Sequence, residues 1–552
     1  MYARWLLPAC VVGAAVAAVA HPWLTGGELL GSDLLKYFLP MLGLMEGRIP
    51  VLEAPALNPY VAGGNPYWAD MQTQVLYPPA WFFSLASPPP AVLMYLAFHA
   101  GVATWGTARM LRALRLSPVA CCAGALAWSL SPWLIQHQVH LTFVAVAAWT
   151  PWIGERFRLV MTADRAWEHA PQLAVLFSVA VLASSPDMIL LGAIPLLAIL
   201  LWDVDHRGVA VALRRGLWVA ACAAVALLLT APMWIPSLRW VPHSIRPMMV
   251  SAGVRPFPLL PPTLLRLLAP GMLGNPLANY SGPGAGGEEE TFPGLLALLA
   301  VPLALHIPRR IAAWGGFLVV TGYLLGFTTT AVAGVNRVPS RFAVVSIFGA
   351  TLLGAAVVDV ARSAGFAALR GRLAAWAVAL AFAQLTFGRT VEHIDDAAAA
   401  FAASSVVATA LTLLLCAAGV AWVGMRGALG AVLILLAVGG HGAHNAWIQQ
   451  EVSPAGTYAR PGAARPAIRQ AGGFMLDAQP ASHLVNFGSA WHVATLRGYS
   501  PLAPRATWDV LSRLDGHPNP ASDGTSALSL IVRHPYSSAW EQLGVGSVLD
   551  MA

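Results

Sequence analysis

Long apolar runs recur along almost the whole chain, and they constrain its fold more than any other feature. A hydrocarbon core about 30 Å thick needs about 20 apolar residues per helix, and we count about thirteen such runs. They centre near residues 12, 99, 125, 144, 177, 195, 221, 299, 320, 351, 380, 411 and 436. Only 10% of the residues are charged, against about a quarter in an ordinary soluble domain. The sequence therefore predicts an all-α polytopic membrane protein.

Arginines mark every second connection between the predicted helices. If the N-terminus is cytoplasmic, these inner connections hold Arg109, Arg112, Arg115, Arg156, Arg158, Arg165, Arg207, Arg214, Arg215, Arg309, Arg310, Arg362, Arg370, Arg372 and Arg426. Positive residues favour the cytoplasmic side. The pattern places residues 21–88, 232–290 and those after about 447 on the outer face. It also accounts for the net charge of +7 by contact with membrane lipids, so no nucleic-acid partner is expected.

Composition divides the chain into a transmembrane domain, 1–446, and a polar C-terminal domain, 447–552. Within the first domain, residues 21–88 and 232–290 are rich in Pro, Gly, Trp and Tyr, which predicts interfacial helices and turns. In the C-terminal domain, LVNFG and ALSLIVRHP are predicted strands and RATWDVLSRL is a predicted helix. We expect this part to be a small α+β extracytoplasmic domain.

The stretch GSDLLKYFLP, residues 31–40, places an acid and the only lysine of the chain directly after the first apolar run. Ser32 is a good N-cap, Asp33 falls in the first turn of a short predicted helix, and Lys36 shares its face. One interpretation is a helix cap paired with an interfacial cation. The other is a general base for an acceptor hydroxyl, beside an ammonium that contacts a phosphate. The residues alone leave both interpretations open.

Two further motifs fall in predicted outer connections. The stretch LNPYVAGGNPYWADMQTQVLYPP, residues 57–79, is dense in aromatic and turn residues, which suit the headgroup level or stacking on a sugar. In SPWLIQHQVHL, His137 and His140 are three positions apart and have no third ligand in sequence. We therefore expect polar groups that line an aqueous cavity, and we predict no metal site.

Acids and arginines also cluster in the later outer connections. GEEETF holds Glu288 to Glu290, which form either a solvated helix N-terminus or a second acid beside an active site. The arginines that depart from the inner bias are Arg239, Arg246, Arg255, Arg266, Arg337 and Arg341. Guanidinium groups suit a lipid-linked phosphate, although contact with lipid headgroups is an equal alternative. With Asp33, these residues indicate an outward cavity that binds an anion.

In the order of its segments, the chain resembles the bacterial YfhO-type membrane proteins, a branch of the GT-C superfamily of glycosyltransferases. The resemblance is carried by GSDLLKYFLP, GRIPVLEAPALNPYVAGGNPYWADMQTQVLYPP, FHAGVATWGTARMLRALRLSP, SLSPWLIQHQVHLTFVAVAAWTPW, NRVPSRF and LRGYSPLAPR. It implies a GT-C-like membrane fold and sugar transfer from a polyprenyl-phosphate donor on the outer face. The acid of the family pattern falls on Asp33. Further pattern positions are Pro40, Asn58, Pro59, Tyr60, Gly63, Gly64, Pro66, Gln74, Tyr77, Pro78 and His140.

Two segments depart from the family pattern. Where the family often has a Gly-His-Pro-Gln-like turn, this chain has SSPDM with Asp187. The family also usually continues past the outer domain to a last membrane helix, whereas this chain stops at LGVGSVLDMA. We therefore expect a truncated or naturally short C-terminus.

Together, the residues and the resemblance predict inverting transfer of a hexosyl or pentosyl group from an undecaprenyl-phosphate sugar to a glycan, lipid or protein acceptor of a bacterial cell envelope. Asp33 is the predicted catalytic base. The predicted substrate-binding residues are Lys36, Asn58, Tyr60, Gln74, His137, His140, Arg246, Glu290, Arg337 and Arg341. The pattern requires no cofactor and leaves a divalent cation, Mg²⁺ or Mn²⁺, open. The rival classes are a transporter or flippase of lipid-linked saccharides, which usually has internal repeats that we do not find, and a non-catalytic envelope scaffold.

Overall fold

The structure is a computed structural model of the chain. It describes residues 3–31, 33–183, 193–196, 209–247, 257–276, 279–284, 286–328, 338–425, 427–450, 452–458, 474–477, 486, 494–496, 500, 503–514 and 545–549. The predictions for SSPDM with Asp187, for Arg337 and for the strand ALSLIVRHP lie outside the described residues.

Helices dominate the described residues and follow the predicted apolar runs. They include α1 (Ala3–Val19), α6 (Pro88–Ala113), α7 (Pro118–Ser129), α9 (Leu141–Thr162), α10 (Ala170–Ala183), α12 (Val209–Trp240), α14 (Leu295–Ala300), α15 (Arg309–Gly326), α16 (Ala343–Val360), α17 (Arg370–Thr390), α18 (Asp396–Val423) and α19 (Gly427–Gln449). Each of these contains one of the predicted centres. Near the remaining centre, at residue 195, the structure describes only residues 193–196, which are helical.

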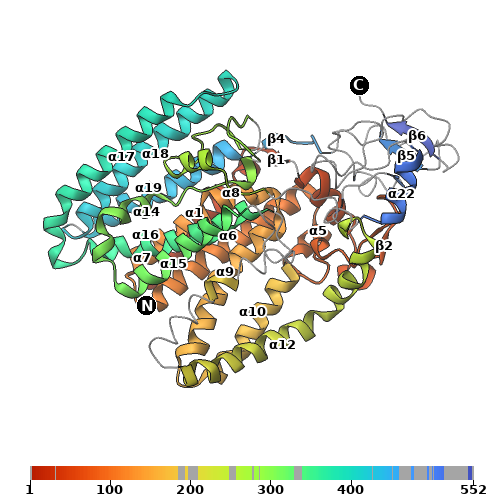
Figure 1. The fold of residues 1–552 in the computed structure, drawn as a ribbon, viewed down its shortest axis with the longest axis horizontal. Coiled ribbons are helices and arrows are strands. Elements are labelled where there is room, and N and C mark those ends of the chain that lie inside the picture. Colours follow the sequence, from red (N-terminus) through yellow and green to blue (C-terminus); the bar gives the residue numbers. More distant parts are fainter. Residues whose placement is uncertain are drawn as a thin grey trace.

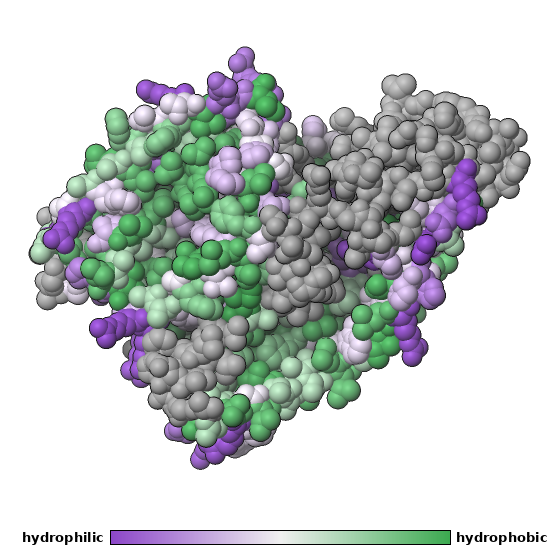
Figure 2. All heavy atoms as spheres, in the orientation of Figure 1, coloured by the Kyte–Doolittle hydropathy of each residue, from purple (hydrophilic) through white to green (hydrophobic). Residues whose placement is uncertain are grey.

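Seven of the described helical segments are long and apolar enough to cross a membrane. They are Pro88–Ala113, Pro118–Val139, Ala210–His243, Pro339–Val360, Ala367–Thr390, Asp396–Val423 and Gly427–Gln449. Hydrophobic side chains cover much of the helical body, and hydrophilic ones gather at its edges and over the C-terminal helix (Figure 2). The chain therefore has the character of a multi-pass membrane protein, whereas a total of about thirteen spans stays a prediction.

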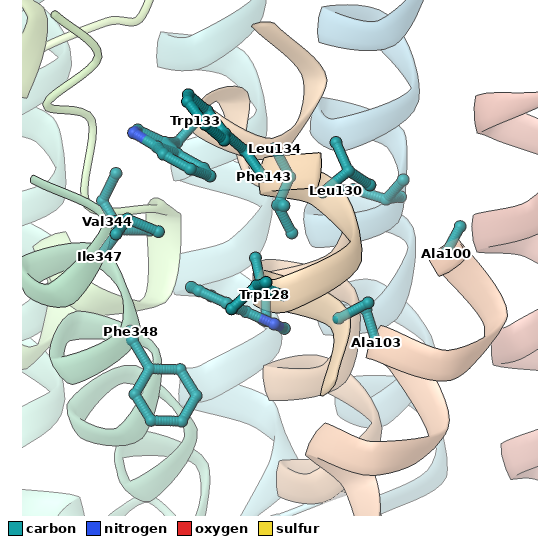
Figure 3. Packing of buried hydrophobic residues seen from close by; sticks show 14 of the residues in the cluster. Ala100, Ala103, Trp128, Leu130, Trp133, Leu134, Phe143, Val344, Ile347 and Phe348 are labelled. Carbon is teal, nitrogen blue, oxygen red and sulfur yellow. The ribbon is translucent and has the colours of Figure 1, made fainter. Parts of the chain in front are cut away.

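The helices pack into one bundle with a shared apolar core. The helix α6 packs against α1, α7 and α9, while α16 packs against α7, α14 and α15 (Figure 1). In the core, Trp128 of α7 meets the ring of Phe348 of α16 edge-on, with 4.9 Å between ring centroids (Figure 3). A Cβ on Gly349 would lie 2.6 Å from the carbonyl oxygen of Gly315. Glycine at this point therefore allows α15 and α16 to approach closely.

The segment between α1 and α6 folds into short elements, as the sequence predicts. They are α2 (His21–Leu24), β1 (Gly27–Leu29), η1 (Leu34–Phe38), α3 (Leu39–Gly43), α4 (Pro50–Glu53), β2 (Leu57–Asn58), β3 (Asn65–Pro66), η2 (Met71–Thr73), η3 (Pro78–Trp81) and α5 (Phe82–Leu85). We call this segment, residues 21–88, the first loop. Its polar side chains Asn58, Asn65, Asp70 and Gln74 are at most 2% exposed, so the first loop is a packed layer.

A single indole ties the first loop to α12. Pro236 lacks an N–H group, so the carbonyl oxygen of Pro232, four residues earlier, receives no hydrogen bond from the helix. The indole Nε1 of Trp68 donates to this oxygen at 2.8 Å. The first loop therefore supplies the donor that the helix lacks.

The end of α19 also returns to the first loop. Strand β4 (Val452–Pro454) pairs antiparallel with β1, with Leu29 opposite Val452 and Gly27 opposite Pro454. The carboxylate of Glu28 accepts hydrogen bonds from the backbone N–H of Gly456 at 2.8 Å and of Tyr458 at 2.9 Å.

Besides β4, the described part of the C-terminal region contains one helix and two strands. Helix α22 (Arg505–Leu514) coincides with the predicted helix RATWDVLSRL. Strands β5 (Phe474–Asp477) and β6 (Val545–Leu549) pair in parallel, which the sequence did not indicate. Of the predicted strand LVNFG, the structure describes only Asn486, which lies in a turn. The remaining short helical turns are α8 (Pro132–Gln136), η4 (His137–Val139), η5 (Ala166–Glu168), η6 (Val241–His243), η7 (Pro261–Leu267), η8 (Gly286–Glu288), η9 (Val301–His306), η10 (Pro339–Phe342) and η11 (Ala364–Leu369).

Candidate functional site

Asp33 stands at the start of η1, a single π-helical turn. The backbone N–H of Leu39 donates to the carbonyl oxygen of Leu34, five residues earlier. Pro40 follows and has no N–H, so the regular α-helical bond to residue 36 is absent. Single π-helical turns occur frequently at functional sites. The sequence therefore places an irregular turn where the acid of the first loop lies.

The side chain of Asp33 does not cap this turn. Its backbone angles are helical, and its carboxylate makes no capping hydrogen bond. The predicted N-cap, Ser32, lies outside the described residues. Instead, Oδ2 of Asp33 lies 3.0 Å from Nε2 of His140, a residue more than a hundred positions away in sequence. Asp33 thus has a partner outside the turn, and the N-cap role of Ser32 stays a prediction.

Glu288 joins Asp33 and His140 in one cluster. The Oε1 atom of Glu288 lies 3.7 Å from Nε2 of His140, and its Oε2 atom lies 3.3 Å from Nε2 of His137. Arg341, on η10 before α16, donates to the same carboxylate from Nε at 2.9 Å and from Nη2 at 2.7 Å. Such a two-point contact fixes both groups in orientation. The acid cluster thus consists of Asp33, His137, His140, Glu288 and Arg341.

Aromatic rings hold the histidines and Arg341 in place. The ring of His137 stacks on Trp133 with 3.8 Å between centroids, and its Nδ1 lies 2.9 Å from the carbonyl oxygen of Trp133. The ring of His140 stacks on Phe143 at 4.8 Å. The guanidinium carbon of Arg341 lies 4.4 Å from the centre of the Phe143 ring, a cation–π contact. Figure 3 shows Trp133 and Phe143 close together in the apolar core.

Asp33 is the most accessible member of the acid cluster. Its side chain is 26% exposed, against 15% for His140 and 13% for Arg341. Lys36 lies half-buried on the same π-helical turn. A ligand that enters the cluster from solvent would therefore meet the Asp33 carboxylate before the other groups.

The charges in the cluster favour its ionised form. Burial raises the pKa of Asp33, but the hydrogen bond and charge of His140 and the charge of Lys36 lower it, with a net direction below the ordinary value. Burial also raises the pKa of Glu288, whereas Arg341 and then His140 hold it well below the ordinary value. For His140 burial lowers the pKa, and the charges of Glu288 and Asp33 raise it to a net value above the ordinary one. The cluster therefore favours the ionised carboxylate of Asp33 and stabilises the protonated form of His140.

Glu290, a predicted substrate-binding residue, lies in a separate buried network. Its carboxylate lies 2.5 Å from Nη2 of Arg266 and also accepts hydrogen bonds from the side chain of Gln136 and from the backbone N–H of Phe292, the latter at 2.6 Å. Arg266 donates in addition to the carbonyl oxygens of Pro270 at 3.0 Å and Gly286 at 2.9 Å. Both charged side chains are fully buried. The structure therefore brings Glu288, not Glu290, to Asp33.

Two predicted residues of the first loop have structural contacts of their own. Asn58 accepts from the backbone N–H of Tyr60 at 3.0 Å. Gln74 has a φ of 53°, donates from Nε2 to the carbonyl oxygen of Ala183 at 2.5 Å, and accepts from the hydroxyl of Tyr95 at 3.1 Å. Both side chains are fully buried. They lie in the packed layer that supports η1.

Of the other predicted binding residues, Tyr60 and Arg246 have contacts or charge effects outside the acid cluster. The carbonyl oxygen of Tyr60 accepts a hydrogen bond from the hydroxyl of Thr495 at 2.7 Å. Arg246 is half-buried, and its charge acts on Asp70. Arg337 lies outside the described residues. Within the described part of the chain, no group of three His, Cys, Asp or Glu side chains is arranged to hold a metal ion, and the question of a divalent cation stays open.

Three residues in or near the site could not be singled out from the sequence. Glu288 was recognised only as part of the GEEETF run, and Arg266 only as one of several outer arginines. Asp70, within YWADMQT, was not distinguished from its neighbours. A fully buried acid in a loop can be inferred from sequence only when its partner is known, and the partners here lie far away along the chain.

Comparisons with known proteins identify the fold. No protein-family model matches the sequence, and no curated protein matches it. The crystal structure of ArnT from Cupriavidus metallidurans bound to undecaprenyl phosphate is similar with a TM-score of 0.55 and 14% identity, over 89% of this chain and 85% of that chain. The crystal structure of the same protein in the apo state is similar with a TM-score of 0.53 and 16% identity, over 88% of this chain and 84% of that chain. The cryo-EM structure of the arabinofuranosyltransferase AftD from Mycobacteria is similar with a TM-score of 0.50 and 15% identity, over 86% of this chain and 29% of that much longer chain.

These structures are GT-C glycosyltransferases. The predicted GT-C-like fold is thus confirmed, and the identities are too low to establish more than the fold.

Proposed function

We propose that the chain is a membrane glycosyltransferase that takes its sugar from a polyprenyl-phosphate donor. One observation carries the proposal: within a GT-C fold, the first loop presents an accessible, ionised carboxylate, Asp33, held by His140 and backed by Glu288 and Arg341. The similarity to a structure with bound undecaprenyl phosphate supports a donor of that class. We also propose, from the sequence resemblance, that the chain is of the YfhO type.

In the proposed reaction, an acceptor hydroxyl attacks the anomeric carbon of the donor sugar. A new C–O bond forms, the bond from the anomeric carbon to the phosphate oxygen breaks, and polyprenyl phosphate leaves with the electron pair. Asp33 takes the hydroxyl proton, and a single displacement inverts the anomeric configuration. One well-placed base supplies about 10² to 10⁴ in rate.

The lowered pKa of Asp33 fits a late proton transfer. A carboxylate held by His140 and Lys36 is a weak base towards a free hydroxyl. As the C–O bond forms on a sugar with oxocarbenium character, the hydroxyl proton becomes strongly acidic, and a weak carboxylate then suffices to accept it. His140 in this scheme keeps Asp33 ionised and aligned. Glu288 stabilises the protonated form of His140 by its charge.

The departing phosphate needs cations near the first loop. Arg341 uses one edge of its guanidinium, Nε and Nη2, for Glu288, so it would act on a phosphate mainly through its charge. Lys36 stands on the same turn as Asp33, and we assign it the first contact with the phosphate. Arg246 and Arg337 are the further candidates. We propose hexosyl or pentosyl transfer to a cell-envelope acceptor on the outer face of a bacterial cytoplasmic membrane. For the chain itself we propose a cytoplasmic N-terminus, about thirteen spans, and two domains, 1–446 and 447–552.

The test uses purified protein in lipid nanodiscs with a panel of radiolabelled polyprenyl-phosphate sugars and an envelope extract as acceptor source. We expect labelled sugar in an acceptor fraction and the release of one polyprenyl phosphate per sugar transferred. Movement of labelled lipid between leaflets without release of polyprenyl phosphate would favour a flippase. The absence of both sugar transfer and lipid movement with every donor tested would contradict the proposal. Analysis of lipid-linked sugars and envelope glycans in a deletion strain would then identify the substrates.

A further inference from the structure

A second acid of the first loop, Asp70, lies buried outside the acid cluster. Its side chain is 2% exposed. Three donors reach it: the hydroxyl of Tyr37 to Oδ2 at 2.5 Å, the backbone N–H of Gln72 to Oδ1 at 3.1 Å, and the hydroxyl of Ser500 to Oδ2 at 3.4 Å. Because it is enclosed by these partners, Asp70 cannot itself meet a substrate from solvent.

The shortest of these contacts leads to the turn that carries Asp33. Tyr37 belongs to η1, four residues after Asp33, and its ring is 2% exposed. The ring of Phe38 packs edge-on against it at 5.1 Å. The hydroxyl of Tyr37 therefore connects the π-helical turn directly to the start of η2, where Asp70 is the N-cap residue.

The described part of the C-terminal region closes over the same place. Thr495 donates from Oγ1 to the carbonyl oxygen of Tyr60 at 2.7 Å, and its own carbonyl oxygen accepts from the backbone N–H of Gly63 at 2.9 Å. The carbonyl oxygen of Ala503 accepts from the backbone N–H of Ile245 at 3.0 Å. Trp508 of α22 is buried in the same apolar core as the first loop. Thr495, Ser500 and Ala503 thus connect the first loop to the residues that follow α12.

We propose that Asp70 is a positioning residue for Asp33: it anchors the π-helical turn through Tyr37, and the C-terminal segment holds it through Ser500. The inference rests on the proposed function, because it assigns a task to residues around its site. The turn has one irregular backbone bond. Besides the contact of Asp33 with His140, its position depends on the hydrogen bond from Tyr37 to Asp70. A misplacement of about 1 Å in a catalytic group costs about 10²-fold in rate.

The test compares Tyr37→Phe, Asp70→Ala and Asp70→Asn in the donor-turnover assay. We expect Tyr37→Phe and Asp70→Ala each to lower kcat by about tenfold or more while KM for the donor changes by less than about threefold, because the ground-state contacts of the lipid donor are untouched. Asp70→Asn should retain most of the rate, since its amide oxygen still accepts from Tyr37. The double variant Tyr37→Phe with Asp70→Ala should be no slower than Asp70→Ala alone, because the bond from Tyr37 is already lost in that single variant.

Thr73→Val is the matched control. Thr73 donates from Oγ1 to the carbonyl oxygens of Asp70 at 2.8 Å and Tyr67 at 3.1 Å, so its loss weakens the same turn without touching the Asp70 carboxylate. It should lower thermal stability about as much as Tyr37→Phe, since each removes one buried hydroxyl donor, and leave kcat near the wild-type value. A loss of kcat in Thr73→Val equal to that in Tyr37→Phe would overturn the proposal. A loss of kcat in the double variant equal to the product of the losses in Tyr37→Phe and Asp70→Ala would also overturn the proposal.

A readout that does not require turnover separates this inference from the proposed function. Hydrogen–deuterium exchange of peptides covering residues 33–45 should rise in Tyr37→Phe and Asp70→Ala and stay unchanged in Thr73→Val. A wild-type protein without transferase activity but with this exchange pattern would refute the proposed function and leave the anchor intact. An active wild-type protein with unchanged exchange and kcat in Tyr37→Phe would refute the anchor alone.

Discussion

The buried pair of Arg266 and Glu290 makes a prediction whose size follows from the structure. In Arg266→Met, the Glu290 carboxylate loses its guanidinium partner at 2.5 Å, and the carbonyl oxygens of Pro270 and Gly286 lose their donors. Removing one member of a fully buried ion pair costs about 3–5 kcal/mol, because the remaining charge is left without compensation. We expect Arg266→Met to lower the free energy of unfolding by about this amount.

Removing the uncompensated charge should restore part of this loss. In the double variant Arg266→Met with Glu290→Gln, the neutral amide oxygen still accepts from the backbone N–H of Phe292. Only neutral hydrogen bonds are then missing, each worth about 1 kcal/mol. The double variant should therefore be more stable than Arg266→Met alone by about 2 kcal/mol.

Denaturant titration in detergent micelles, followed by tryptophan fluorescence, measures both differences. Gly316→Ala is a suitable control for handling, since a Cβ there meets no atom within 4 Å. A cost below about 1 kcal/mol for Arg266→Met would refute the buried pair. A double variant that is less stable than Arg266→Met would refute the argument that the stranded charge causes the loss.

Three further outcomes follow from the structure. The pKa of His140 is raised above its ordinary 6.5, so the stability that its protonated form contributes is complete below pH 6.5 and is lost as pH rises through the raised pKa. The difference in thermal midpoint between wild type and His140→Gln should therefore shrink with rising pH. A difference that stays constant would contradict the pairing with Asp33. Trp68→Phe removes the indole donor from the Pro232 carbonyl oxygen and should cost about 0.5–1.5 kcal/mol in the same denaturant titration, whereas a neutral effect would refute this link. Gly349→Leu forces a Cβ towards the carbonyl of Gly315 and should lower the yield of folded protein in membranes by far more than Gly316→Ala; equal yields would speak against the close contact.

The helical body could be predicted from the sequence because its cause is local. A run of about 20 apolar residues satisfies its own backbone hydrogen bonds in a membrane, so each run specifies a helix at its own position. The helix at 505–514 is recognisable for a related reason, since Trp508 and Leu511 place apolar groups on one face. The parallel pair of β5 and β6 was not recognisable, because its strands lie far apart along the chain and depend on a tertiary contact.

The candidate site was predictable only in its outline. Asp33 and His140 could each be selected, from an acid after the first apolar run and from a polar connection between helices, but their contact at 3.0 Å joins segments more than a hundred residues apart. The sequence led us to select Glu290, whereas Glu288 is the acid beside Asp33. The two acids are two positions apart and contact different partners, Arg341 for Glu288 and Arg266 for Glu290. Arg266, a candidate for a phosphate from its outer position, is instead fully buried on Glu290. Such differences arise from packing, which sequence composition does not encode.

The most direct test of the account is the turnover of wild type and Asp33→Asn with a labelled polyprenyl-phosphate sugar and its acceptor, at saturating donor. The account predicts that Asp33→Asn folds as the wild type does, judged by its thermal midpoint in detergent, and loses about 10² to 10⁴ in kcat. Lys36→Met should instead raise KM for the donor. An Asp33→Asn variant that releases polyprenyl phosphate at the wild-type rate would contradict the central claim that this carboxylate is the catalytic base.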